Sequence, residues 1–385
     1  MKILIVSLLI IILGSSFAWA NPAVPELPLD LLDSTSVNNV NHFIQAVNHE
    51  LNEDIPQLTA ETIKDIALKG LSLNWQTISS KFVSYLFKEL ATNIHLMGKL
   101  LFLAVLCALL QNLQNSFDQS AISLLAYSVC FIFLCVIALS AFYQGLTLAR
   151  ETVGNMVGFM EALLPLLLSL LAGVGALTSV ALLTPLMLLV VGVTSVVVKD
   201  IILPLLFLTA VLECVNYLSG KYKLTNLTGV LKQAGMMILG FVLVVFIGIV
   251  SIQGVAGSIA DGLTLRTAKY ATATFIPVVG KMFADTVELV MGASLLLKNA
   301  VGIFGVLSIS LLCALPLIKL ISLVIVLKIA GALIQPMGDE KMAKCLDAMG
   351  NNLLLLFGAV LTVALMFFLI ITMIIGAGSV ALMLR

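Results

Sequence analysis

The chain has 385 residues, of which 61% are hydrophobic and only 10% are charged. A water-soluble domain usually carries about 25% charged residues, so this composition excludes an ordinary soluble fold and predicts a membrane protein. The formal net charge is zero, so no overall basic field points to nucleic acid, and none is expected as a partner.

Residues 1–20 have the pattern of a secretory signal peptide. Lys2 supplies the positive start, Ile3 to Leu13 form an apolar run, and Ala18-Trp19-Ala20 is an A-x-A cleavage site. An uncleaved first helix is the alternative, but about eleven apolar residues are too few to span a bilayer comfortably. We therefore predict cleavage after Ala20.

Residues 21–94 are predicted to be an exported juxtamembrane region. The segment begins with the proline-rich stretch Pro22 to Pro28 and contains many acidic residues. Its last part predicts an amphipathic helix, because apolar residues recur on one helical face with Lys81 and Lys88 off that face. The residues of this face are Ile78, Phe82, Tyr85, Leu86 and Leu90. Such a helix can lie in the membrane interface, pack on a partner, or belong to a small helical domain.

Residues 95–385 are predicted to be an all-α, polytopic membrane domain with interrupted helices. Uncharged or nearly uncharged stretches long enough to span a bilayer follow one another. The expected spans are 100–117, 119–149, one or two within 162–198, then 201–218, 236–255, 301–318, 321–333 and 353–375. Pro165, Gly173, Gly175 and Pro185 interrupt the 162–198 stretch.

The lysines between residues 221 and 232 are the best marker of a cytoplasmic loop. With a cleaved signal the amino terminus lies outside, and five crossings before this loop place it inside. This count of five crossings includes two within residues 162–198. The number and orientation of spans after residue 255 stay open.

A weak internal repeat is a further hypothesis. Leu203-Pro204-Leu205 returns as Leu315-Pro316-Leu317, and Pro165 returns as Pro277, both at a shift of 112 residues. Two related halves with interrupted helices are a common transporter plan.

Catalytic signatures are absent from the sequence, and we predict that the protein is not an enzyme. No G-x-x-x-x-G-K-[ST] motif occurs, so no nucleotide hydrolysis is expected. The histidines are His42, His49 and His95, which do not make a zinc site or a Ser–His centre. We expect no cofactor and no bound metal.

The six cysteines do not suggest a site either. Five of them lie in apolar runs, where cysteine behaves as a small buried hydrophobe. Cys130 and Cys135 lack the spacing of metal ligands, and no disulfide framework is implied.

Two carboxylates within apolar sequence are candidates for a pathway. Glu161 precedes Leu163-Leu164-Pro165, and Glu213 lies between Leu212 and Cys214. A charge at the bilayer centre costs about 3 kcal/mol or more, so such residues usually face a cavity, a partner or water. Alternatively, each lies near the end of a span and reaches the headgroups.

The segment 253–285 combines small residues, charges and helix breakers. Small side chains near Gly254 and Gly257 would let helices approach closely. A broken, charged segment at membrane depth has to line a cavity or be buried in protein, unless it is an amphipathic loop on the membrane surface. The candidate pathway or assembly residues here are Gly254, Gly257, Asp261, Arg266, Lys269, Pro277, Gly280 and Asp285.

The chain resembles the stage III sporulation protein AE family. The resemblance covers essentially the whole chain and is sharpest in Gly254 to Gly257, Leu265 to Tyr270 and Phe275 to Gly280. It implies a role in endospore formation, in the mother-cell membrane around the forespore. It also implies partners: the other proteins of the stage III sporulation A operon, including a separate ATPase, and a forespore channel protein.

On this basis we expect a non-enzymatic subunit of a secretion-like channel complex, with a permease-like or export-gate role. The alternatives are an autonomous ion-coupled secondary transporter that uses Glu161 or Glu213, and a structural anchor. The substrate, the oligomeric state, and whether a pore lies within one chain are not determined by the sequence.

Overall fold

The structure is a computed structural model of the chain that describes residues 37–42, 44–45, 75–116, 121–218, 224–275, 279–337 and 340–383. Every longer element among these residues is helical, as the composition predicts. The expected signal peptide, and the exported region before residue 75 apart from short helical pieces at 37–45, lie outside the described residues.

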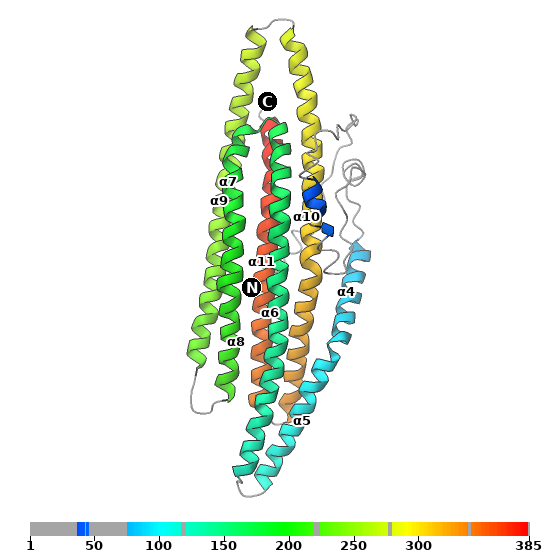
Figure 1. Ribbon diagram of the computed structural model, residues 1–385, viewed down its shortest axis with the longest axis vertical. Coiled ribbons are helices and arrows are strands. Elements are labelled where there is room, and N and C mark those ends of the chain that lie inside the picture. Colours follow the sequence, from blue (N-terminus) through cyan, green and yellow to red (C-terminus); the bar gives the residue numbers. More distant parts are fainter. Residues whose placement is uncertain are drawn as a thin grey trace.

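The helices form an elongated bundle with their axes close to one direction (Figure 1). The elements are α4 (Trp75–Thr92), α5 (Ile94–Ser116), α6 (Ala121–Gly173), α7 (Leu177–Val196), η2 (Val197–Ile202), α8 (Leu203–Leu218), α9 (Thr225–Phe275), α10 (Val279–Ile334), η3 (Gln335–Met337) and α11 (Glu340–Met383). α10, α11 and α6 pack on one another, and α7, α8 and α9 pack against this group.

Five helical segments are long and apolar enough to cross a membrane, or six if the bent pair formed by α4 and α5 counts as one span. This confirms the polytopic helical class. α6 has 53 residues and α10 has 56. At 1.5 Å per residue each is about 80 Å long, whereas the hydrocarbon layer is about 30 Å thick. These helices therefore extend well beyond the bilayer.

The predicted amphipathic helix is α4, which packs against α10. It meets α5 at a bend of 46°. At the bend, Asn93 donates a side-chain hydrogen bond to Ser322 Oγ of α10 at 3.2 Å. In the structure α4 thus packs on a helix of its own chain, and a position of its outer face in the membrane interface stays a prediction.

The interruption expected within residues 162–198 is a tight turn between α6 and α7. Gly175 has φ 88°, a conformation that residues with a Cβ rarely adopt. The turn closes with hydrogen bonds from Gly175 N to Ala172 O (2.8 Å) and from Ala176 N to Leu171 O (3.3 Å). Pro165 and Pro185 lie inside helices and do not end them.

A second interruption is the π-helical stretch η2. Proline has no N–H and its ring clashes with the carbonyl four residues earlier, so Pro204 disturbs the regular turn around Asp200. The chain widens there, and Leu203 N bonds to Val198 O, five residues back. The helix direction continues into α8, so α7, η2 and α8 form one segment.

The number of crossings before the lysine loop differs from the prediction. α6 is continuous from Ala121 to Gly173, so no turn occurs near Arg150. Three membrane-long segments precede residue 221 in place of the five expected, if α4 and α5 are counted as one. Both numbers are odd, so the inside position expected for the lysine loop is unaffected. Arg150 looks like the end of a span in the sequence, but a helix longer than the bilayer can carry a charged residue without ending there.

The internal repeat stays a hypothesis. The shift of 112 residues relates α6 to α9, and the α7–α8 segment to α10, and in Figure 1 each pair runs in the same direction along the bundle. The local geometry differs, because Pro204 follows a π stretch whereas Pro316 lies inside the α-helix α10.

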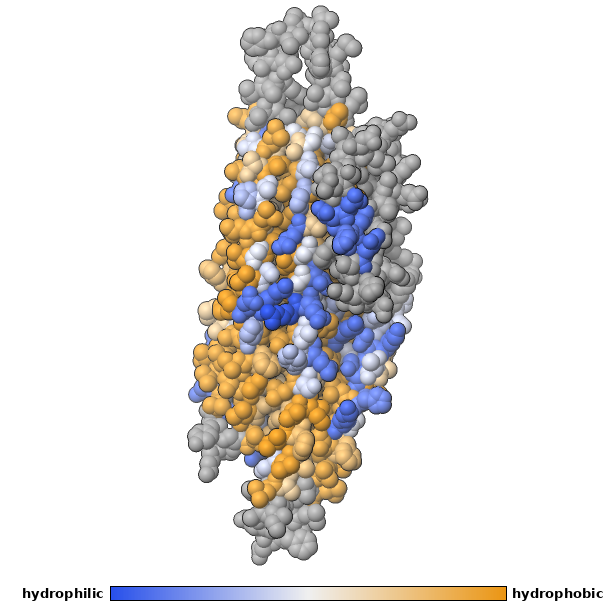
Figure 2. All heavy atoms as spheres, viewed as in Figure 1, coloured by the Kyte–Doolittle hydropathy of each residue, from blue (hydrophilic) through white to orange (hydrophobic). Residues whose placement is uncertain are grey.

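The surface of the bundle is largely apolar. Figure 2 shows apolar zones over most of the visible face, with polar side chains gathered in a band across its middle. Many large apolar residues on α9 are exposed, among them Phe241 and Val244. Such a surface is suited to lipid or to other membrane proteins rather than to water.

Candidate functional site

A partly buried ionic cluster joins α8, α9 and α11. Glu213 Oε1 lies 3.6 Å from Lys232 Nζ, and Asn352 donates a hydrogen bond to Glu213 Oε2 at 2.7 Å. The side chains of Glu213 and Lys232 are only 13% and 26% exposed. Both carboxylate oxygens of Glu213 contact side chains of other helices, so Glu213 links α8 to α9 and to α11.

A second buried carboxylate caps a helix. Asp261 of α9 is almost fully buried, and its Oδ1 accepts hydrogen bonds from Thr178 N (2.9 Å) and Ser179 N (3.2 Å) at the start of α7. The first amides of a helix have no partner within the helix and carry partial positive charge. Asp261 therefore does for α7 what an N-cap residue normally does, although it comes from a distant part of the chain.

Small residues of α9 allow this approach. A methyl group on Gly257 would lie 2.5 Å from Ser179 Oγ, which is closer than van der Waals contact permits. One on Gly254 would lie 3.5 Å from Met373 Cγ of α11, which is ordinary contact. Gly257 thus sets the distance between α9 and α7.

A lysine is buried between α10 and α11. Lys298 has no exposed surface, and its Nζ donates a hydrogen bond to the Ile375 carbonyl oxygen at 2.8 Å. Charged groups inside a membrane bundle are costly and usually find such partners. Lys298 thus adds a buried polar contact to a helix pair that is also joined by the salt bridge between Lys328 Nζ and Asp347 Oδ1 (2.7 Å).

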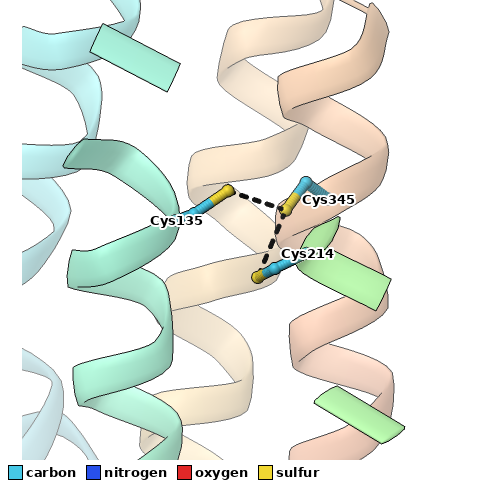
Figure 3. A group of neighbouring side chains, drawn as sticks. All are labelled: Cys135, Cys214 and Cys345. Carbon is cyan, nitrogen blue, oxygen red and sulfur yellow. Dashed lines mark hydrogen bonds between the residues drawn. The ribbon is translucent and has the colours of Figure 1, made fainter. Parts of the chain in front are cut away.

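Three thiols converge close to the ionic cluster. Cys135 of α6, Cys214 of α8 and Cys345 of α11 point toward one another in Figure 3. Cys345 Sγ lies 3.9 Å from both Cys135 Sγ and Cys214 Sγ, and all three sulfurs lie within 4.8 Å of one another. We call these residues the thiol cluster; all three are buried.

The sequence-predicted residues do not form one site. Glu161 is exposed on α6, whereas Glu213 is partly buried and contacts Lys232 and Asn352. Arg266 and Lys269 belong to α9, and Gly280 and Asp285 to α10, but their side chains lie outside the described residues. Pro277 also lies outside them.

Sequence reasoning missed the partners of these residues. The sequence places Lys232 at the end of a loop. It gives no local reason to single out Lys298, Asn352 or the three cysteines of the thiol cluster. Cys135, Cys214 and Cys345 are far apart in the sequence and each lies in apolar surroundings. No local spacing could indicate that they meet, since only the packing of three helices brings them together.

The arrangement supports a role of these residues in helix assembly. Within the described residues, the buried carboxylates and the buried lysines that we identify contact other helices of the same chain. An apolar groove between α6 and α7, lined by Pro165, Leu168 and Thr184 among others, has a volume of about 230 Å³. Its lining is suited to an acyl chain or an apolar side chain rather than to a polar substrate.

Comparison with known proteins identifies the family of the chain. The profile of the family "Stage III sporulation protein AE" matches residues 59–378. A protein of Bacillus subtilis (strain 168) named "Stage III sporulation protein AE" is 37% identical over 352 residues, which cover 91% of this chain and 88% of that protein. No solved structure matches the chain.

Proposed function

The chain belongs to the stage III sporulation protein AE family, and from this membership we propose that it is a non-enzymatic subunit of the channel complex between mother cell and forespore. As a stage III sporulation protein it acts in endospore formation, and its long apolar helices fit a multi-pass membrane protein. In this proposal the protein lies in the mother-cell membrane that surrounds the forespore.

The observation that supports a subunit role is the contrast between charged side chains that are paired inside the bundle and an exposed apolar exterior. Glu213, Asp261 and Lys298 are engaged inside the bundle. On α9, however, Phe241 and Val244 are 68% and 69% exposed. A helix that is apolar on its outer side can lie against lipid or bind other membrane subunits.

The partners in this proposal are the other proteins of the stage III sporulation A operon, a separate ATPase among them, and a forespore channel protein. The absence of a nucleotide-binding motif from the sequence supports this division of labour. Within this complex we propose a permease-like or export-gate role for the protein.

Site-specific photo-crosslinking in sporulating cells tests the proposal. A photoreactive residue at position 241 is expected to capture another protein of the complex, and the same residue at the buried position 367 is the control. Crosslinks at 241 to lipid only, in cells that complete sporulation, would contradict a subunit interface on α9.

The second candidate is an autonomous ion-coupled transporter. The observation in its favour is Glu213, an acidic residue within a membrane-long segment. Its pairing with Lys232 and Asn352 argues against it, because a coupling site has to be free to bind an ion. Reconstitution of the purified chain in liposomes distinguishes the two: ion-driven uptake by the chain alone would favour the transporter, and its absence the subunit.

A purely structural anchor is the third candidate, and Arg266 and Lys269 on α9 test it. Their joint replacement by alanine should abolish sporulation while the protein still reaches the membrane if the segment 253–285 has a role in transport or gating. Full sporulation by the double variant would favour the anchor.

A further inference from the structure

We propose that Cys135, Cys214 and Cys345 form a three-coordinate thiolate site for a single Cu(I) ion. The first observation is convergence. Three of the six cysteines come from three different helices, and their sulfurs meet in one buried place (Figure 3). Packing as small hydrophobes does not require them to meet, since Cys107 and Cys313 are buried elsewhere without joining the cluster.

The spacing of the sulfurs fits metal coordination. A metal–sulfur bond is about 2.3 Å long, so three sulfurs around one ion lie about 4 Å from one another in a trigonal arrangement. The two shortest separations here are 3.9 Å, from Cys345 Sγ to Cys135 Sγ and to Cys214 Sγ. A disulfide requires about 2.05 Å, so the cluster is closer to a metal site than to a bond between two of its members.

The ligand number favours copper over zinc. Zinc in structural sites takes four ligands, and soft thiolates without a fourth ligand suit Cu(I). In the described part of the chain no fourth His, Cys, Asp or Glu joins the group. Glu213 is next to Cys214 in sequence, but its two oxygens are engaged by Lys232 and Asn352.

Two of the three thiols lie close to the ends of their helices. Cys214 lies four residues before Leu218, the last residue of α8, and Cys345 lies five residues after Glu340, the first residue of α11. At 1.5 Å per residue these two thiols are therefore about 6 to 8 Å along their helices from these ends. Cys135 lies further along its helix, 14 residues after Ala121, the first residue of α6.

Binding exchanges protons for the metal. One Cu⁺ and three thiols give one copper–trithiolate centre and three released protons, with no change in oxidation state. The ion would then join α6, α8 and α11, in addition to the contacts that already hold them. This site is independent of the channel role proposed above, because it rests only on the geometry of the three sulfurs.

Anaerobic titration of the purified full-length chain in detergent tests the site. Cu(I) is supplied in competition with a chromogenic copper chelator, and the thiolate-to-copper charge-transfer absorption is followed. We expect one Cu(I) per chain, and X-ray absorption of the loaded wild-type protein should find three sulfur neighbours. Cys135→Ser, Cys214→Ser and Cys345→Ser should each weaken binding by at least about 100-fold, as loss of a direct ligand exceeds the effect of an outer contact.

Cys107→Ser and Cys313→Ser are the matched controls, since both residues are buried thiols outside the cluster. Both variants should bind Cu(I) like the wild type. The proposal is overturned if the wild type retains no Cu(I) against the chelator, if a control variant loses binding as strongly as a cluster variant, or if Zn(II) displaces Cu(I). The X-ray absorption measurement needs no variant, so a variant that fails to fold leaves the test intact, and two sulfur neighbours in place of three would also refute the site.

Discussion

Helices α9 and α11 are similarly apolar in sequence but occupy different environments. In the most apolar stretch of α11, 50% of the residues are buried inside the bundle, whereas in that of α9 only 17% are buried. Phe367 of α11 is fully buried, and Phe241 of α9 is 68% exposed. Apolar character therefore shows that a helix leaves water, and it does not show whether the helix then contacts its own chain, lipid or a partner.

The two helices are also held in place differently. α11 is held along its length by buried apolar residues that include Leu356, Val363 and Phe367, in addition to its polar contacts at Asn352 and Ile375. α9 is joined to its neighbours by specific contacts at two levels, the Lys232–Glu213 pair and the Asp261 contact with α7. From this contrast we expect α11 to respond most to changes of side-chain volume and α9 most to loss of single polar contacts.

The largest expected effect is that of Phe367→Ala on α11. The change leaves a cavity in the core, so we expect a loss of stability of about 3 kcal/mol. Phe241→Ala on α9 is the matched control, and it should cost much less because its side chain already faces outward. Thermal unfolding in detergent, followed by circular dichroism, measures both. Equal losses for the two variants would remove the contrast between the helices.

Asp261→Ala comes next. It removes the acceptor for the first amides of α7, which are then unpaired in apolar surroundings, and the expected loss is about 2 kcal/mol. Asp261→Asn keeps one acceptor oxygen, so it should lose less. Hydrogen exchange at Thr178 and Ser179 is expected to accelerate in the alanine variant. Unchanged exchange there would show that the cap is not formed.

Gly257→Ala should separate α9 from α7 because the added methyl group meets Ser179. We expect a loss of about 1 to 2 kcal/mol from this overpacking. Gly248→Ala on the same helix has nothing within 4 Å of the new methyl group, so it should be neutral or stabilise the helix. The opposite signs, read from the same unfolding transition, make this pair informative even though each change is small. If both substitutions stabilised the protein, Gly257 would not lie in close contact with Ser179 of α7.

The smallest expected effect is the coupling between Glu213 and Lys232. A double-mutant cycle with alanine at both positions should give about 1 kcal/mol of interaction free energy. Arg150 and Asp200 provide the matched pair, since their charged atoms are also 3.6 Å apart but the side chains are 63% and 57% exposed. Their coupling should be smaller, because two exposed side chains lose more conformational freedom when they are held in one geometry. A larger coupling for the exposed pair would contradict the burial described here.

Much of the architecture followed from sequence patterns. The all-helical membrane class and the helix around Tyr85 and Leu90 could be predicted because apolar periodicity is a local property. The number of membrane crossings could not be predicted from the sequence, because Arg150 looks like the end of a span although α6 continues through it.

The candidate site was less accessible to sequence reasoning. Glu213 and Asp261 can be recognised in the sequence as charged residues within apolar stretches. Their partners Lys232 and Thr178 cannot, because these contacts depend on which helices pack side by side. The thiol cluster is the extreme case, since 210 positions separate Cys135 from Cys345. Long-range packing, which a single sequence does not encode in any short motif, decides such contacts.

The cap on α7 has a consequence for biosynthesis. Asp261 is made 83 positions after Thr178, whose amide it accepts. While the ribosome is still adding α8 and the first half of α9, the amino end of α7 has no such acceptor from its own chain. The bundle can thus complete this part of its tertiary structure only after most of α9 has been synthesised, and nascent chains that stop earlier would carry an exposed helix end for quality control to recognise.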